Sequence, residues 1–145
     1  MNENTAETLL RKVLPGARSH IDDAEGRPRL SMKEVFAEDM VYHGFDASGQ
    51  LRRCVGLQAF SEFARECRSL MEVYHDEVLS IVSAGPDVAI LHARAHRRAK
   101  HTGESVTYEY GLLMRTDNGK ITYGADLIDQ QTTEFWQRAY AASQA

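Results

Sequence analysis

Few cysteines, few prolines and no long apolar run characterise this chain of 145 residues. Two cysteines, Cys54 and Cys67, are too few for the disulfide framework of a secreted domain and fit a reducing cytoplasm better. No apolar run reaches the roughly 20 residues of a membrane-spanning helix, and the segment MNENTAETLL is too polar for a secretory signal. Because 17 Lys and Arg face 21 Asp and Glu, the net charge is −4 and no overall positive field favours nucleic acid. We therefore expect one cytoplasmic domain, residues 1–145, that binds neither membranes nor nucleic acid.

Apolar periodicity predicts the order of helices and strands. Leu57, Phe60 and Phe63 begin a stripe with a spacing of three or four residues, which is typical of a helix with one buried face. Further helices are expected near residues 5–14, 31–36 and 131–142, and strands near residues 40–45, 73–83, 88–100, 105–115 and 120–128. This order predicts an α+β fold in which a curved antiparallel sheet wraps around helices. The polar segment 17–30 is expected to be a long loop and is a candidate lid.

Alternation along two of these strands predicts which side chains face inward, because successive residues of a strand point to opposite faces. In residues 105–115 the even positions are aromatic or aliphatic, and they include Tyr108, Tyr110 and Leu112. In residues 88–100 the odd positions are mostly small and apolar, and they include Ala93 and Ala95. We expect these two sets to line the inside of the sheet.

The opposite face of residues 88–100 carries a row of basic side chains, His92, Arg94 and His96. Two histidines four residues apart would be a ligand pair on a helix, but on a strand they lie roughly 13 Å apart, too far to share one metal ion. We therefore predict no metal site here, and we assign this row to a solvent-facing or subunit-facing surface. The sequence also shows no phosphate loop, haem motif or metal cluster, so we predict no cofactor.

Asp126 is the main candidate for proton transfer, although its orientation is open from the pattern alone. It shares one face of residues 120–128 with Thr122 and Gly124, and apolar residues occupy the other face. If Asp126 points inward, desolvation raises the pKa of its carboxyl group and suits it to acid–base catalysis near neutral pH. If it points outward, it is solvated or ion-paired and has a structural role only.

Four segments, FAEDMVYHG, VGLQAF, KHTGES and GLLMRTDNGKITYGADLID, resemble the nuclear-transport-factor-2-like superfamily. This superfamily includes SnoaL-like polyketide cyclases, ketosteroid isomerases and limonene epoxide hydrolases. The resemblance covers residues 32–137, and it implies a single SnoaL-like domain. The implied fold is a cone-shaped roll whose curved antiparallel (mixed) sheet wraps around N-terminal helices and encloses an internal hydrophobic pocket. Relatives commonly dimerise through the outer sheet face, so the resemblance also implies a homodimer.

The resemblance assigns roles to individual residues. Asp126 stands where the cyclases and epoxide hydrolases keep a catalytic Asp, and Tyr42 matches the water-positioning tyrosine of the epoxide hydrolases. Tyr108 and Tyr110 are then candidate hydroxyl donors, although buried tyrosines are more often core residues. The catalytic candidates are therefore Asp126, Tyr42, Tyr108 and Tyr110.

Other positions of the resembling families hold different residues here. Gly44 replaces both the Asn of the epoxide hydrolases and the base of the isomerases, and Leu112 replaces the acid of the isomerases. Asp46 lies on the same face as Gly44 near the end of its strand, where an exposed turn residue is the favoured interpretation. The expected pocket lining is Ala93, Ala95, Leu112, Gly44, Asp46 and Phe60.

Two hypotheses of different classes follow. The first is a cofactor-independent enzyme of the cyclase, isomerase or hydrolase type that acts on a small apolar carbonyl, hydroxyl or epoxide compound through Asp126. The second is a non-catalytic module of the same fold that binds a small molecule or serves as an accessory subunit. A protein–protein domain with a filled pocket is a third interpretation, and Ala93 and Ala95 argue against it.

Overall fold

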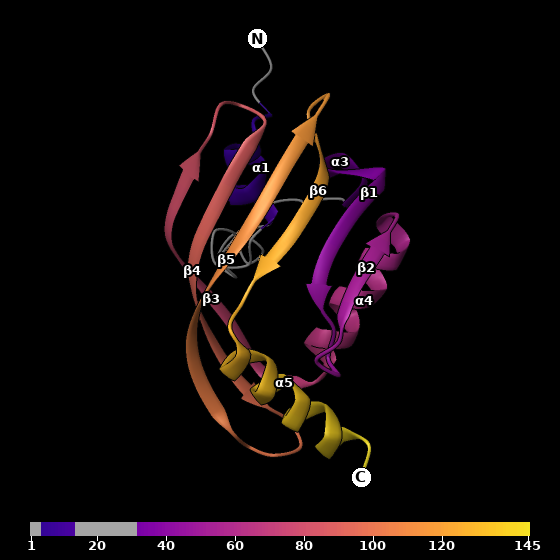
Figure 1. The fold of residues 1–145 in the computed structure, drawn as a ribbon, viewed down its shortest axis with the longest axis vertical. Helices are drawn as coiled ribbons and strands as arrows, with labels where there is room; N and C mark the ends of the chain where they lie inside the picture. Colours follow the sequence, from indigo (N-terminus) through magenta and orange to yellow (C-terminus); the bar gives the residue numbers. More distant parts are fainter. Residues whose placement is uncertain (1–3, 14–31) are drawn as a thin grey trace, which may run out of the picture.

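A computed structural model describes residues 4–13 and 32–145 (Figure 1). The candidate lid at residues 17–30 lies outside the described residues. The helices are α1 (Ala6–Val13), α3 (Met32–Val35), α4 (Leu57–Ser69) and α5 (Gln130–Ser143). The strands are β1 (Phe36–Phe45), β2 (Leu51–Val55), β3 (Met71–Ser83), β4 (Val88–Ala99), β5 (Ser105–Asp117) and β6 (Lys120–Leu127). None of these helices is long and apolar enough to cross a membrane.

The six strands form one curved, unclosed sheet in the order β2-β1-β6-β5-β4-β3 (Figure 1). Neighbouring strands are antiparallel except for β1 and β6, which run parallel and place an early segment of the chain beside a late one. Asn118 and Gly119 connect β5 to β6 with φ angles of 50° and 76°. Both values are positive, as the two central residues of a type I′ turn require. The predicted α+β cone with a mixed sheet is confirmed.

Two local predictions around β1 and β2 were wrong. Phe36 begins a strand instead of ending a helix, so β1 is four residues longer than its predicted extent. Residues 51–55, where no strand was predicted, form the edge strand β2 around Cys54. This strand is only five residues long and pairs with β1 alone, so Leu51 and Val55 remain 70% and 59% exposed. Its pattern therefore lacks the apolar alternation by which strands are recognised.

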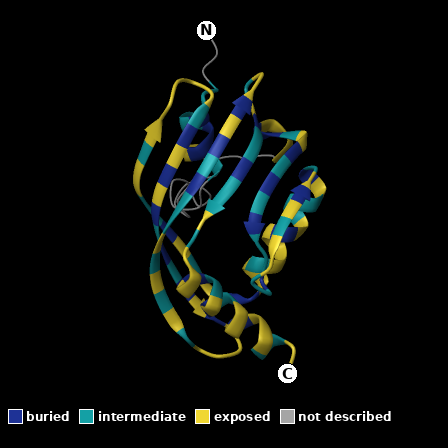
Figure 2. Cartoon of the chain, in the orientation of Figure 1, coloured by how far each residue is buried: buried dark blue, intermediate teal, exposed yellow. Residues whose placement is uncertain are grey.

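Helices α1 and α4 pack against the inner face of the sheet and form the main core with it. Burial alternates along β4, where every odd position from Ala89 to Ala99 is buried and every even position is intermediate or exposed (Figure 2). Helix α5 packs across the other end of the molecule, where Phe135 and Ala139 contact a smaller cluster. That cluster contains Ala47, Leu70, Met71 and Ala99. The predicted inward faces of β4 and β5 are confirmed.

Candidate functional site

Tyr42 and Asp126 meet on the inner face where the parallel strands β1 and β6 lie side by side. Tyr42 lies opposite Gly124 in the strand register, and Asp126 follows Gly124 by two residues on the same face. The Tyr42 hydroxyl donates a hydrogen bond to Oδ1 of Asp126. Asp126 also lies opposite Leu112 of β5, whose side chain is buried. Asp126 therefore points inward, which decides between the two orientations left open by the sequence.

Two glycines provide the space for this pair. A Cβ atom at Gly124 would lie 2.7 Å from Cδ2 of Tyr42, and a Cβ atom at Gly44 would lie 2.6 Å from Oδ2 of Asp126. Both distances are far below van der Waals contact, so no side chain fits at either position. The Tyr42 ring therefore lies over Gly124 of the neighbouring strand, and the Asp126 carboxylate lies over Gly44.

Aromatic rings from α4 hold the Tyr42 ring in place. The ring centroid of Phe60 lies 4.6 Å from that of Tyr42, and the ring centroid of Phe63 lies 5.7 Å from it. These separations are those of favourable aromatic pairs. Tyr42 is only 6% exposed. Phe60, a predicted pocket residue, therefore supports the tyrosine from the helix side.

Burial controls the protonation of both groups. Desolvation raises the pKa of Asp126 to about 6, while the hydrogen bonds from the Tyr42 hydroxyl and the Phe45 backbone amide act in the opposite direction. Desolvation, followed by the charge of Asp126, raises the pKa of Tyr42 well above its usual value. At neutral pH the phenol therefore stays protonated, and Asp126 is mostly ionised, with its midpoint about one pH unit below neutrality.

The remaining inner-face candidates lie along β4 and β5. Ala93 lies opposite Tyr110 and Ala95 lies opposite Tyr108. Both alanines are fully buried, and both tyrosines are half-buried. Tyr110 is two residues from Leu112, the residue paired with Asp126. Small side chains on β4 thus lie opposite tyrosines on β5, next to the Tyr42–Asp126 pair.

Asp46 belongs to the turn between β1 and β2, as its favoured interpretation expects, but its side chain is only 13% exposed and not fully solvated. Its Oδ1 atom accepts hydrogen bonds from the backbone amides of Ser48 and Gln50, both at 3.0 Å, and its Oδ2 atom lies 3.4 Å from Nε of Arg52. It also lines a surface pocket of about 520 Å³ between this turn and the ends of α4 and α5. Within the described residues, its hydrogen bonds and ion pair involve neither Tyr42 nor Asp126.

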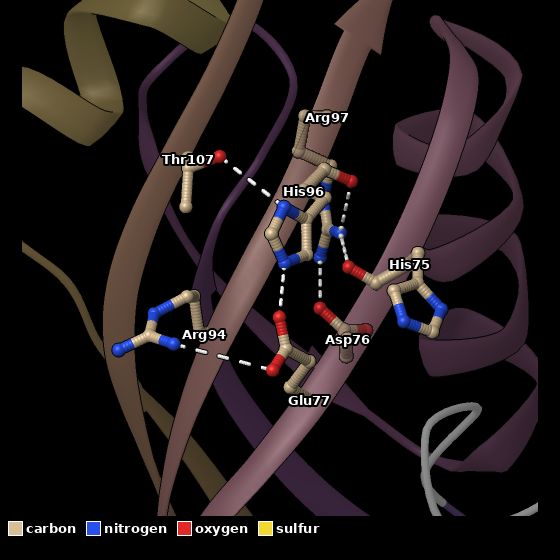
Figure 3. Close-up of polar contacts among 7 residues, drawn as sticks. All are labelled: His75, Asp76, Glu77, Arg94, His96, Arg97 and Thr107. Carbon is tan, nitrogen blue, oxygen red and sulfur yellow. Dashed lines mark hydrogen bonds and ion pairs between the residues drawn. The ribbon is translucent and has the colours of Figure 1, made fainter.

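A buried ion pair on the inner face was missed by the sequence analysis. Nη2 of Arg97 on β4 lies 2.7 Å from Oδ1 of Asp76 on β3, and both side chains are only 3% exposed (Figure 3). The Arg97 guanidinium also lies 3.6 Å from the centre of the Tyr74 ring. The signal was available, because Arg97 occupies an odd position in β4 between Ala95 and Ala99.

The basic row faces outward, as predicted. Nε2 of His92 lies 2.9 Å from Oε1 of Glu109, and His96 contacts Glu77 through its Nε2 atom (Figure 3). The hydrogen bond with His96 is the main cause that holds the pKa of Glu77 below its usual value. Within residues 4–13 and 32–145, no three His, Cys, Asp or Glu side chains lie close enough to hold a metal ion.

Comparison with known proteins agrees with this architecture. The model of the SnoaL-like domain family matches residues 19–124. No curated protein sequence matches the chain significantly. An NTF2-like protein of unknown function from Burkholderia pseudomallei has a TM-score of 0.70 at 17% identity, with 92% of this chain and 95% of that chain covered.

Two further solved structures are similar. A protein from Xanthomonas campestris that has been proposed to be a polyketide cyclase has a TM-score of 0.64 at 17% identity, covering 96% of this chain and 99% of that one. A hypothetical protein with a ketosteroid isomerase-like fold from Catenulispora acidiphila, in complex with trimethylamine, has a TM-score of 0.61 at 20% identity. That alignment covers 72% of this chain and 77% of the other. At these identities the structural likeness shows the fold alone.

Proposed function

This chain belongs to the SnoaL-like domain family, and on that premise we propose that it is a cofactor-independent acid–base enzyme. Its substrate would be a small, largely apolar carbonyl, hydroxyl or epoxide compound. Asp126 would transfer the proton, Tyr42 would hold the Asp126 carboxylate, and Tyr108 and Tyr110 would donate hydrogen bonds to the developing oxyanion.

The observation that carries this proposal is the part-buried hydrogen bond between Tyr42 and Asp126. A carboxyl group with a pKa of about 6 can accept a proton and return it near neutral pH, which an exposed aspartate does poorly. Because Tyr42 occupies Oδ1, proton exchange with a substrate would take place at Oδ2. The apolar rings around the pair would exclude water and strengthen the interactions within the site.

For a carbonyl compound, the reaction begins when Asp126 takes a proton from the carbon next to the carbonyl group. The electron pair of the broken C–H bond moves to the carbonyl oxygen, and the resulting enolate accepts hydrogen bonds from the tyrosines. Return of the proton to another carbon gives isomerisation. Attack of the enolate on a second carbonyl carbon forms a C–C bond, and the new alkoxide takes the proton from Asp126, which gives cyclisation.

We also propose that the chain acts in the cytoplasm as a homodimer that pairs through the outer sheet face. Three aliphatic side chains on or beside that face, Val82, Ile90 and Leu127, are 64%, 44% and 50% exposed, and burial of apolar side chains favours association. Light scattering on the purified chain should give twice the monomer mass, and a monomer would contradict this part of the proposal.

The second candidate function is a non-catalytic module that binds a small molecule, and the loss of side chains at Gly44, Ala93 and Ala95 favours it. An Asp126→Asn variant separates the two functions, because the amide keeps the shape of the side chain but cannot exchange a proton at neutral pH. The assay follows deuterium incorporation or turnover of enolisable ketones, with ligand binding measured in parallel. Retained binding with a loss of exchange of at least 100-fold supports the enzyme. Unchanged behaviour of the variant in both measurements supports the binding module.

A further inference from the structure

The outer face of the sheet carries a row of apolar side chains that crosses four strands. The members of this row lie opposite one another in the strand register: Val82 of β3, Ile90 of β4, Leu113 of β5 and Ala125 of β6. Leu127 lies two residues along β6 and is exposed beside the row. Burial of such a row favours association, so this is the surface through which the proposed homodimer would pair.

Charged and ionisable side chains continue the same face along β3, β4 and β5. We call them the histidine patch: His75, Glu77, His92, Arg94, His96 and Glu109. On β4, His92 follows Ile90 by two residues, and both line a shallow groove of about 580 Å³. A second copy that covers the apolar row would therefore also cover part of the histidine patch.

His96 contacts both neighbouring strands. Its Nε2 atom makes a hydrogen bond with Oε1 of Glu77 on β3, and its Nδ1 atom lies 3.2 Å from Oγ1 of Thr107 on β5 (Figure 3). The His75 ring lies opposite His96 on β3, and the two ring centroids are 5.7 Å apart. Because the two rings stack, a positive charge on both of them would be unfavourable.

The charges around the histidines are nearly balanced. Nε2 of His92 lies 2.9 Å from Oε1 of Glu109. The arginines on this face of β4 already have carboxylate partners: Arg94 with Glu77 at 4.0 Å and Arg98 with Glu72 at 3.2 Å. Within the patch one arginine faces two glutamates, so the net charge of the patch is −1 while its three imidazoles are neutral and +2 once all three are protonated.

Protonation of the imidazoles would oppose the pairing of two such faces. An imidazole ordinarily changes its charge between about pH 5 and pH 8. Two faces with positive patches repel each other, and a cation loses more hydration than a neutral imidazole when it is covered. The net charge of the whole chain has the opposite effect, because acidification brings its value of −4 closer to zero. Weaker association at low pH would therefore come from the histidine patch.

We propose that the histidine patch makes self-association pH-dependent, so that the outer face pairs with a second copy of this chain when the three imidazoles are neutral and separates from it when they are protonated. This inference rests on the homodimer of the proposed function. Protons that bind only to the separated copies raise the Kd of the dimer, because binding to one state shifts the equilibrium toward that state. The Kd at pH 5.5 should therefore be at least about tenfold higher than at pH 8.

Analytical ultracentrifugation of the purified chain at pH 8 and pH 5.5, at constant ionic strength, measures the Kd of the dimer. The triple variant His75→Gln/His92→Gln/His96→Gln should have the same Kd at both pH values, because glutamine stays neutral. His101→Gln is the matched control, since His101 lies exposed in the turn between β4 and β5, and it should keep the pH dependence of the wild type. Asp126→Asn should keep it too, because Asp126, whose pKa is about 6, lies on the inner face.

A wild-type Kd that is equal at both pH values would overturn this inference and leave the homodimer intact, and so would a triple variant whose dimer still weakens at pH 5.5. A monomer at both pH values would overturn the homodimer and the inference together, whereas proton exchange through Asp126 is measured separately and would stand. His92→Lys/His96→Lys gives a second check, because lysine is charged at pH 8 and should already weaken the dimer there. Unchanged affinity of that variant at pH 8 would contradict the inference. Circular dichroism at both pH values excludes acid unfolding as the cause of dissociation.

Discussion

The carboxylate of Asp126 occupies the space that a side chain at Gly44 would fill. A Cβ atom there would lie 2.6 Å from Oδ2, so residue 44 must be glycine while Asp126 keeps this position. The resembling isomerases place their base at the position of Gly44, on β1. Here the carboxylate comes from β6 instead and reaches into the same space. The carboxylate in this space therefore belongs to β6 and not to β1.

The pKa of Asp126 should be about 6 in a carboxyl-carbon NMR titration, above its ordinary value of 3.8. In Tyr42→Phe the pKa should rise further, because the lost hydrogen bond stabilises the ionised carboxylate. Tyr123→Phe is the matched control, since that hydroxyl contacts His43 instead of Asp126. A titration of Asp126 near 3.8 in the wild-type chain would contradict the desolvated site.

Alanine at either glycine of the site should destabilise the fold and disturb Asp126. We expect Gly124→Ala to lower the free energy of unfolding by about 1–3 kcal/mol, because its Cβ atom would meet the Tyr42 ring at 2.7 Å. The displaced ring should weaken the hydrogen bond and raise the pKa of Asp126. Gly111→Ala is the comparison, since its nearest neighbour is the Leu127 side chain at 3.2 Å. Equal stability and equal Asp126 pKa values in the two variants would refute this account of the glycines.

Stability should depend on pH through Asp126. Because its pKa is raised on folding, its contribution is most favourable below pH 3.8 and is lost as the pH rises through 6. Asp126→Asn removes this titration, so the stability of the variant relative to wild type should increase by about 3 kcal/mol between pH 3.5 and pH 8. Urea unfolding of both proteins at several pH values measures the difference. A difference that stays constant with pH would show that Asp126 does not change its pKa on folding.

Removing one partner of the buried ion pair should cost more than removing both. Arg97→Met leaves the Asp76 carboxylate buried and unpaired, and we expect a loss of about 3–5 kcal/mol in the free energy of unfolding. The double variant Asp76→Leu/Arg97→Met should be more stable than Arg97→Met alone. The exposed pair of Arg138 and Glu104, also close at 2.9 Å, is the control, and Arg138→Met should cost less than about 1 kcal/mol. Additive effects at Asp76 and Arg97 would argue against direct coupling.

Sequence patterns predicted those parts of the site that depend on local alternation. The inward faces of β4 and β5 follow from a period of two. The hairpin turn between β5 and β6 follows from Asn118 and Gly119, because these residues tolerate the positive φ angles that the turn requires. The same rule places Arg97 inward, as a charged residue within a row of alanines. Its partner Asp76 lies on another strand, so the pair depends on the register of β3 against β4.

The orientation of Asp126 could not be predicted from its own strand, because the apolar side chains of β6 occupy the face opposite Asp126. It depends on the parallel pairing of β1 with β6, which brings Gly124 opposite Tyr42. Pairing between segments so distant in sequence leaves no local pattern. The resemblance identifies Asp126 as a candidate, and the structure shows that its side chain points inward.

The parallel contact between β1 and β6 also has a consequence for the folding of the chain. Tyr42 and Asp126 are separated by 84 residues, and four strands and one long helix lie between them in sequence. Contacts of such large sequence separation form slowly, because a long loop must close before they add stability. During synthesis Tyr42 emerges long before its partner, so the Tyr42–Asp126 pair cannot assemble until β6 has been made. The titration of Asp126 would therefore serve as an internal reporter of completed folding.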